Sequence, residues 1–131
     1  MIASIELQKA IYKELTTKTP YTVFDTAPLN QSFPYIIIGN TTRVPNLTKD
    51  LNGYTMSVMF HCYSNKNSSK EVKEMSHVVE TTLIQDFDID GFYNTKQDLT
   101  LETSQDEDLN GEVVHHYILE MEFILTEKGE Y

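Results

Sequence analysis

Two short acidic segments are the parts of this 131-residue chain whose residue types and spacing come closest to a binding motif. Residues 86–91 (DFDIDG) and 106–111 (DEDLNG) both match the first half of an EF-hand calcium loop. The second half fails in both, because the position that needs a bidentate Glu is Gln97 in one and Tyr117 in the other. Acidic turns with Asn and Gly are also ordinary chain connections. We therefore predict solvated turns and keep calcium binding as the weaker alternative, with ligands from Asp86, Asp88 and Asp90 or from the loop that begins at Asp106 and ends at Gly111.

The histidines and the cysteine do not form a metal-binding pattern. His115 and His116 are adjacent in a predicted strand, so their side chains point to opposite faces and cannot share an ion without further ligands. We expect one of the two to be exposed and the other to be partly buried and hydrogen-bonded. Cys62 is the single cysteine and falls among apolar residues, which predicts a buried, unreactive thiol. The sequence predicts neither a metal nor a cofactor.

No catalytic constellation stands out in the sequence. The G-x-S-x-G elbow of many hydrolases and the glycine-rich phosphate loop are both absent. Glu120 and Glu122 share one face of a predicted strand and could in principle act as an acid–base pair. Residues of this kind more often form a solvated outer face or part of an interface. We therefore predict that the protein is not an enzyme.

Charge is distributed unevenly along the chain. Residues 1–85 carry eight Lys and Arg against seven Asp and Glu, whereas residues 86–131 carry two against thirteen. A surface this acidic does not bind phosphates tightly, which argues against a nucleic-acid-binding protein and favours contact with a basic protein surface. We predict that the acidic segment makes protein contacts through Asp106, Glu107, Asp108 and Glu112.

A polar stretch over residues 40–52 is the second predicted contact region. It contains Arg43, Lys49 and Asp50 and is expected to form a long loop or an irregular hairpin arm. Long loops on a rigid scaffold often carry binding function. The alternative is a mobile loop with no partner.

The clearest structural signal is a change of hydrophobic period near the middle of the chain. Residues 54–63 alternate between apolar and mixed positions, which predicts a strand. After a polar turn, apolar residues recur at spacings of three and four, which predicts an amphipathic helix. Ser68 and Glu71 have the spacing of a capping box at the start of that helix. The helical stripe consists of Val72, Met75, Val79 and Leu83.

The remaining pattern predicts one further helix and several strands. A helix from Ser4 to about Lys18 would be capped by Ser4 and end before Pro20. Strands are expected over residues 21–24, 33–39, 92–103 and 113–126, with the run 33–39 buried on both faces. The pair Asn110 and Gly111 predicts a tight hairpin turn.

The element order is therefore α-β-β-β-α-β-β. It predicts an α+β fold in a single domain over residues 1–131, with a mostly antiparallel sheet of about four to five strands and two helices packed on one face. No apolar run is long enough to span a membrane, and the first residues lack the features of a signal peptide.

The chain resembles the tail-completion (tail-terminator) proteins of long-tailed bacteriophages. The resemblance covers nearly the whole sequence and is carried by the helix around residues 5–12, the run FPYIIIG at 33–39, the strand 54–63 and the helix 68–83. These motifs are structural, and the family offers no catalytic residues to transfer. The acidic residues 105–112 match no motif of the family.

The resemblance implies a structural virion protein that is assembled in the host cytoplasm and resides in the tail, at the head–tail interface. Such a protein forms a homo-hexameric ring that caps the head-proximal end of the tail tube, stops tube polymerisation and offers a face to the head-completion proteins of the connector. DNA would pass through the ring without specific binding. Another head–tail connector component, a stopper or an adaptor, is the alternative role, and a small calcium-binding domain is a weaker one.

Overall fold

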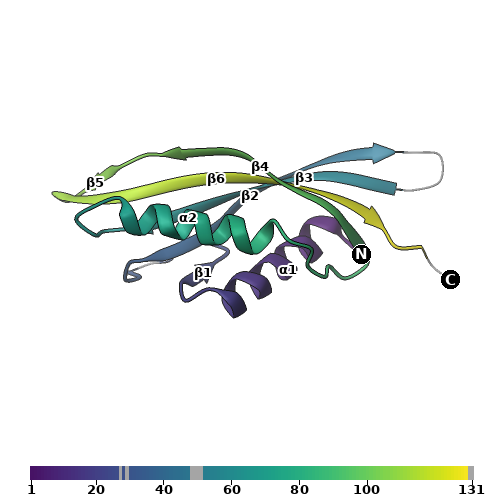
Figure 1. Ribbon diagram of the computed structural model, residues 1–131, viewed down its shortest axis with the longest axis horizontal. Helices are drawn as coiled ribbons and strands as arrows, with labels where there is room; N and C mark the ends of the chain where they lie inside the picture. Colours follow the sequence, from purple (N-terminus) through teal and green to yellow (C-terminus); the bar gives the residue numbers. More distant parts are fainter. Residues whose placement is uncertain (27, 29, 48–51, 130–131) are drawn as a thin grey trace.

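The computed structural model describes residues 1–26, 28, 30–47 and 52–129. Within these residues, two helices lie against one face of a six-stranded sheet (Figure 1). This confirms the predicted α+β fold, with more strands than the four to five expected, because a short strand precedes the last one. The elements are α1 (Ala3–Lys18), β1 (Thr22–Phe24), β2 (Tyr35–Leu47), β3 (Asn52–Ser64), α2 (Lys70–Leu83), β4 (Phe92–Ser104), β5 (Glu107–Leu109) and β6 (Glu112–Glu127).

The sheet has the strand order β1-β2-β3-β6-β4, and β5 pairs with β6. The pair β1–β2 is parallel, and the pairs among the other described strands are antiparallel. The two strands with the clearest alternation, β3 and β6, therefore lie next to each other in the middle of the sheet, where Phe60 pairs with Leu119. None of the helices in the described part of the chain is long and apolar enough to cross a membrane.

The core lies between the sheet and the two helices. Alternate residues of β3 and β6 point toward the helices and are buried, as the alternation predicts. Fully burying one such large apolar side chain contributes about 1.5–3 kcal/mol to stability. The residues of the two strands that belong to this core are Met56, Val58, Phe60, Cys62, Leu119, Met121, Phe123 and Leu125.

Helix α2 buries its predicted stripe but begins differently from the prediction. Val72, Met75, Val79 and Leu83 are all buried. The helix starts at Lys70 with Ser69 as N-cap, whose side chain makes no capping hydrogen bond. The Ser68 hydroxyl accepts a hydrogen bond from the amide of Lys70 at 3.4 Å, whereas a capping box needs the amide of Glu71 as the donor. The predicted capping box is therefore wrong. Glu71 instead accepts a hydrogen bond of 2.6 Å from the hydroxyl of Ser64, which is fully buried at the end of β3.

Helix α1 begins at Ala3, so Ser4 lies inside the helix and the predicted N-cap is wrong. The buried residues recur at every fourth position, which leaves Ile5 on another side of the helix and 50% exposed. The helix ends before Pro20 as predicted, where both the amide and the hydroxyl of Thr19 donate to the carbonyl of Leu15. The buried residues are Ala3, Leu7, Ile11 and Leu15.

Strand β2 extends much further than the sequence predicted. Residues 40–47 are strand rather than loop, because the long β3 offers them a continuous antiparallel partner. The hairpin-arm alternative is thus correct for these residues, with a register shift between Ile38 and Thr41. The expected burial on both faces is wrong, since Ile36 and Ile38 are buried but Ile37 only partly. Beyond β1, which pairs with residues 35–37 alone, β2 forms an edge of the sheet.

Strand β4 forms the opposite edge and is interrupted twice. Its register with β6 shifts between Asn94 and Lys96 and again between Leu99 and Leu101. The extra residue in each shift is a threonine whose hydroxyl donates to a carbonyl of β6: Thr95 to Ile124 at 2.8 Å and Thr100 to Glu120 at 3.1 Å. The two bulges are therefore held in place by side-chain hydrogen bonds.

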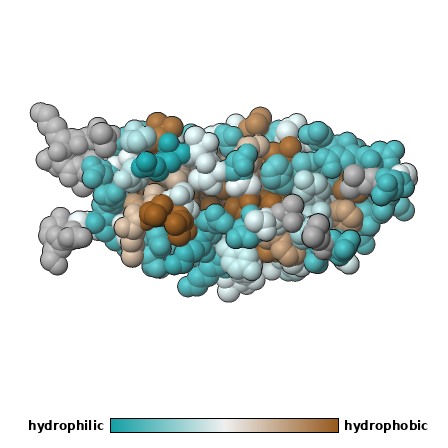
Figure 2. Space-filling model, turned by 180° about the vertical axis from the view of Figure 1, so that it is seen from behind, coloured by the Kyte–Doolittle hydropathy of each residue, from teal (hydrophilic) through white to brown (hydrophobic). Residues whose placement is uncertain are grey.

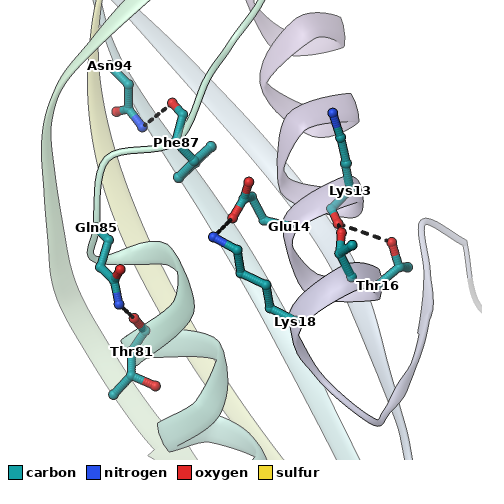
Figure 3. A network of polar contacts seen from close by, with 9 residues as sticks. Lys13, Glu14, Thr16, Lys18, Thr81, Gln85, Phe87 and Asn94 are labelled. Carbon is teal, nitrogen blue, oxygen red and sulfur yellow. Dashed lines mark hydrogen bonds and ion pairs between the residues drawn. The ribbon is translucent and has the colours of Figure 1, made fainter.

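Local polar contacts position the ends of the helices and the start of β4 (Figure 3). Glu14 and Lys18 form an ion pair of 2.6 Å on the side of α1 that faces α2 (Figure 3). The side-chain amide of Asn94 donates to the carbonyl of Phe87 at 3.5 Å, which links β4 to the connection after α2. Exposed ion pairs one helical turn apart contribute only about 0.3–0.5 kcal/mol, so the core supplies most of the stability.

Candidate functional site

The predicted contact residues occupy opposite ends of the sheet (Figure 1). Arg43 lies on the distal part of β2, in the hairpin with β3, whereas the acidic residues lie around β5 at the other end. The structure therefore does not bring the two predicted regions together. Two further predicted residues, Lys49 and Asp50, lie outside the described residues.

Arg43 already has partners within its own chain. Its guanidinium lies 4.9 Å from the ring centroid of Tyr54, and the Tyr54 hydroxyl donates to Glu127 at 2.6 Å. This hydrogen bond lowers the pKa of the Glu127 carboxyl. Arg43 is nevertheless exposed at the edge of the sheet, so it remains available to a partner.

The acidic residues are gathered in one hairpin, which we call the acidic tip: Asp106, Glu107, Asp108 and Glu112. The turn between β5 and β6 is the predicted one, with Asn110 at φ 56° and Gly111 at φ 82°. The amide of Gly111 donates to the Asp108 carboxylate at 3.0 Å. The end of the molecule that carries the tip is predominantly hydrophilic, on the right in Figure 2.

Two histidines of β6 hold the acidic tip. His115 Nδ1 lies 2.9 Å from Asp106 Oδ1, and His116 Nδ1 lies 3.1 Å from Glu107 Oε1. Because adjacent strand residues point to opposite faces, these two contacts lie on opposite sides of the sheet. The expectation that one histidine would be exposed is wrong, since the His115 side chain is only 13% exposed and His116 is buried.

His116 is also part of a cluster of rings on the sheet face that the helices leave uncovered, called here the outer face. His116 Nε2 lies 2.8 Å from His61 Nδ1, and the His116 ring stacks on Tyr63 at 4.2 Å between centroids. Tyr35 follows at 5.1 Å from Tyr63. Burial and the negative charge of Glu107 raise the pKa of Tyr63 to about 12.

The cluster alters the titration of His61 as well. Burial, and secondarily the neighbouring His116, lower the pKa of His61. Reasoning from the sequence missed this cluster because no single strand contains it. The sequence did show that His61 and His116 each occupy a non-core position of an alternating strand. Only the pairing of β3 with β6, which places Tyr63 opposite His116, brings the two histidines together.

The first acidic loop lies between α2 and β4. Asp86, Asp88 and Asp90 are all exposed, and Asp86 accepts a hydrogen bond from the Gln97 side chain at 3.3 Å. Where an EF-hand would continue into a second helix, this chain enters β4. Over the part of the chain that the structure describes, no group of three or more His, Cys, Asp or Glu side chains is placed to hold a metal ion.

Glu120 and Glu122 lie on the outer face and have the surroundings of surface residues. Glu120 accepts a hydrogen bond from Thr100, and Glu122 pairs across the sheet with Asp98. Both glutamates are half-buried among strand neighbours. A carboxylate that faces a second carboxylate on the neighbouring strand suits an interface with a basic partner.

Comparison with known proteins identifies the family. The family model described as "Tail completion protein gp17" matches residues 10–126, which is most of the chain. The chain belongs to this family. A chain of a solved structure entitled "Virion of native gene transfer agent (GTA) particle" has a similar fold, with a TM-score of 0.79, 13% sequence identity and coverage of 94% of this chain and 96% of that chain. No curated protein sequence matches.

Membership of the tail completion family confirms the resemblance noted from the sequence. The protein is a structural component of a bacteriophage-type virion and belongs to its tail. For such a protein the surfaces that contact other virion proteins are the regions of functional interest. The acidic tip and the Arg43 end are the two regions that remain candidates for those contacts.

Cys62 has the buried position predicted for it. The side chain is fully buried in the core, and burial raises the pKa of its thiol to about 12. A thiol that stays protonated and inaccessible is a packing residue, so Cys62 belongs to the scaffold of this tail completion protein and not to its contact surfaces.

Proposed function

We propose that this protein caps the head-proximal end of the tail tube, stops tube polymerisation and provides the interface to which the head is joined. The observation that supports this proposal is the match of the tail completion family over residues 10–126. The acting form is a homo-hexameric ring, and its partners are the tail-tube protein and a head-completion or connector protein. The protein has no catalytic step and no cofactor in this role.

Two distinct ends of the sheet support a ring. A closed ring of identical subunits uses two different surfaces of each subunit, which meet heterologously around the axis. This chain presents an acidic tip at one end and the Arg43 hairpin at the other (Figure 1). Charge differences between surfaces help them to recognise the correct neighbour. Both ends are therefore assigned to contacts with subunits or with other tail and connector proteins.

The net charge of −10 is consistent with the passage of DNA. Acidic surfaces repel the phosphate backbone, so a ring of these chains would let DNA through without binding it specifically. A basic lining would instead retain the DNA during ejection. The charge thus supports a passive conduit.

Tube assembly in the presence of the purified protein tests the proposal. Tail-tube protein polymerised with the protein should give shorter tubes with one capped end in electron micrographs, and light scattering should detect a species of six times the 15.1 kDa chain mass. A protein that stays monomeric at every concentration, alone and with tail-tube protein, and leaves tube length unchanged would contradict it.

Another head–tail connector component, a stopper or an adaptor, is the second candidate. The same family match and the same acidic surface support it, because both roles need contacts with virion proteins and no chemistry. The tube assay separates the two. A stopper or adaptor would bind connector protein and leave tube length unaffected.

A further inference from the structure

An open groove lies between the first turns of α2 and the segment that joins α1 to β1, and we call it the α2 groove. Its volume is about 760 Å³, and it is lined by Tyr21 from that segment and by polar residues of α2 and of the turn before it. Lys70 and Lys73 line it and are exposed. Glu74 also lines it and pairs with Lys70 at 3.9 Å.

The backbone adds positive potential to the α2 groove. The first N–H groups of a helix have no acceptor within the helix, and the aligned peptide dipoles place partial positive charge at that end. Ser69, the N-cap, lines the groove and makes no capping hydrogen bond with its side chain. The carboxylate of Glu71, in the first turn, is bonded to the Ser64 hydroxyl. Together with the two lysines, this helix end favours an acidic segment in the groove.

The acidic tip is such a segment, and its shape is fixed before a partner binds. Strand β5 pairs with β6, the amide of Gln105 donates to the carbonyl of His116 at 2.7 Å, and the side chain of Asn65 donates to Glu112 at 2.9 Å. Asp108 and Glu112 remain exposed. A hairpin that is already ordered loses little conformational entropy on binding, so its charges are available at low cost.

The α2 groove and the acidic tip lie at the same end of the sheet. Ser64, the last residue of β3, pairs with His115 near the start of β6, so the start of α2 and the tip share this end (Figure 1). A rotation about an axis parallel to the strands keeps each residue at its own height. Two surfaces of identical subunits can therefore meet around such an axis when they share an end, as these two do.

The two surfaces lie on opposite edges of the sheet. The tip continues the β4 side of β6, because Ser104 of β4 lies opposite Tyr117 and Glu107 of β5 lies opposite Val114. Tyr21 directly precedes β1, the strand at the other edge. A tip fixed on the β4 side is directed away from the groove of its own chain, and the tip of a neighbouring copy beside β1 is directed toward it.

We propose that the acidic tip of one subunit docks in the α2 groove of the next, with Asp108 and Glu112 against Lys70 and Lys73. This inference rests on the proposed function, because it takes a second copy of the chain in the ring as the occupant. Each subunit gives its tip to one neighbour and its groove to the other. That is the heterologous contact that closes a ring.

The division of charge along the chain favours a second copy as the occupant. Eight of the ten basic residues precede residue 86, and thirteen of the twenty acidic residues follow residue 85. The first group includes the lysines of both helices, and the second includes the acidic tip. Opposite charges on the two surfaces speed the correct encounter, and like charges reject a mismatched one.

Charge reversal of each surface tests the docking without tail-tube protein. The groove variant carries Lys70→Glu and Lys73→Glu, and the tip variant carries Asp108→Lys and Glu112→Lys. Each variant alone meets like charge at every contact, so its self-association should weaken by about a hundredfold or more. Light scattering over a range of concentrations measures the loss.

Mixing the two variants should restore assembly. The altered tip then meets the altered groove, and the unaltered tip of one variant meets the unaltered groove of the other. All contacts are satisfied when the two chains alternate around a ring with an even number of subunits, such as the proposed hexamer. Native mass spectrometry should find three copies of each chain. Unfolded variants would not rescue each other in this way.

The matched control carries Lys9→Glu and Lys13→Glu, which make the same change of charge at exposed positions of α1. It should assemble as the unaltered protein does. Loss of assembly in this control as well would assign the effect to the total charge of the helices and overturn the docking.

The remaining outcomes separate the docking from the proposed function. Normal rings from either variant, or a mixture that stays dissociated while the unaltered protein forms rings, would overturn the docking and leave the ring intact. A groove variant that forms rings but no longer binds connector protein would make an acidic segment of that protein the occupant instead. Rescue in the mixture with tubes of unchanged length would keep the docking and remove tube capping. An unaltered protein and a mixture that both stay monomeric, also with tail-tube protein, would overturn the ring and the docking together.

Discussion

The two faces of the central sheet are made from alternate residues of the same strands, yet they are built on different chemistry. The face under the helices holds Phe60, Leu119 and their apolar neighbours, which are shielded from water. The outer face carries stacked rings and carboxylates around His61 and His116. The inner face therefore supplies most of the stability, whereas the outer face carries titratable side chains.

The largest expected loss of stability comes from comparing substitutions at two neighbouring residues of β3, one on each face of the sheet. Phe60→Ala removes a fully buried ring and should lower the free energy of unfolding by about 3–5 kcal/mol. Met59→Ala changes the adjacent, half-buried residue on the outer face and should cost about 1 kcal/mol or less. Urea unfolding at neutral pH measures both. Equal losses of unfolding free energy in the two variants would show that the outer face is packed as closely as the inner face.

A smaller effect is expected where the backbone passes close to the histidine pair. A Cβ at Gly39 would lie 2.9 Å from two atoms of the His61 ring and 3.0 Å from the carbonyl oxygen of Met59, so Gly39→Ala should cost about 1–3 kcal/mol and disturb His61. Thermal unfolding and the His61 resonances report the two consequences.

Gly111→Ala is the matched comparison for Gly39→Ala. Gly111 has a positive φ of 82° but no neighbouring atom within 4 Å of an added Cβ. Its substitution should cost about 1–2 kcal/mol through backbone strain alone and leave the His61 resonances unchanged. A shift of those resonances in the Gly111 variant would mean that the tip and the ring cluster are coupled more tightly than the contacts indicate.

The pH dependence of stability sharpens the contrast further and should be smaller still. The pKa of His61 is lower in the folded chain, so the folded state binds fewer protons than the unfolded state. The contribution of His61 to the free energy of unfolding is fully present above the ordinary histidine pKa of about 6.5. It is lost as the pH falls from there through the lowered pKa of His61 in the folded chain. The urea midpoint of the unaltered protein should fall more between pH 7 and about pH 5 than that of His61→Asn.

Calcium should have the smallest effect of all. The exposed Asp86, Asp88 and Asp90 lead into a strand and not into the second helix of an EF-hand, so titration calorimetry with millimolar calcium should give no binding heat. A chelator should likewise leave the unfolding temperature unchanged. Saturable heat that disappears in an Asp86→Asn and Asp88→Asn double variant would restore the calcium alternative.

The inner face could be predicted from the sequence, because burial imposes a period on each element separately. The alternation in β3 and the stripe on α2 were both visible for this reason. Residues 40–47 were not recognised as strand throughout, because their Asn and Thr residues have no apolar alternation and depend on β3 for pairing. The capping box failed because Ser64, seven residues from Glu71 in the chain, competes for the same carboxylate.

The outer face could be predicted only in part. The acidic tip was located by its charge and by the Asn110–Gly111 turn, which the structure confirms. Its role in protein contacts stays a prediction, as does that of Arg43. The His61–His116 contact arises from the register between two strands that are distant in the chain, and the sequence of either strand alone contains no trace of it. Long-range register is thus the information that a local pattern lacks.

The two threonine-filled bulges of β4 have a consequence for growth by strand addition. A strand approaching this edge would meet backbone donors and acceptors that fall out of phase twice within thirteen residues, near Lys96 and again near Leu101. A β edge of this kind is a poor template for backbone pairing. A partner that meets the protein at the β4 edge therefore has to recognise side chains there, which makes such a contact open to dissection by single substitutions.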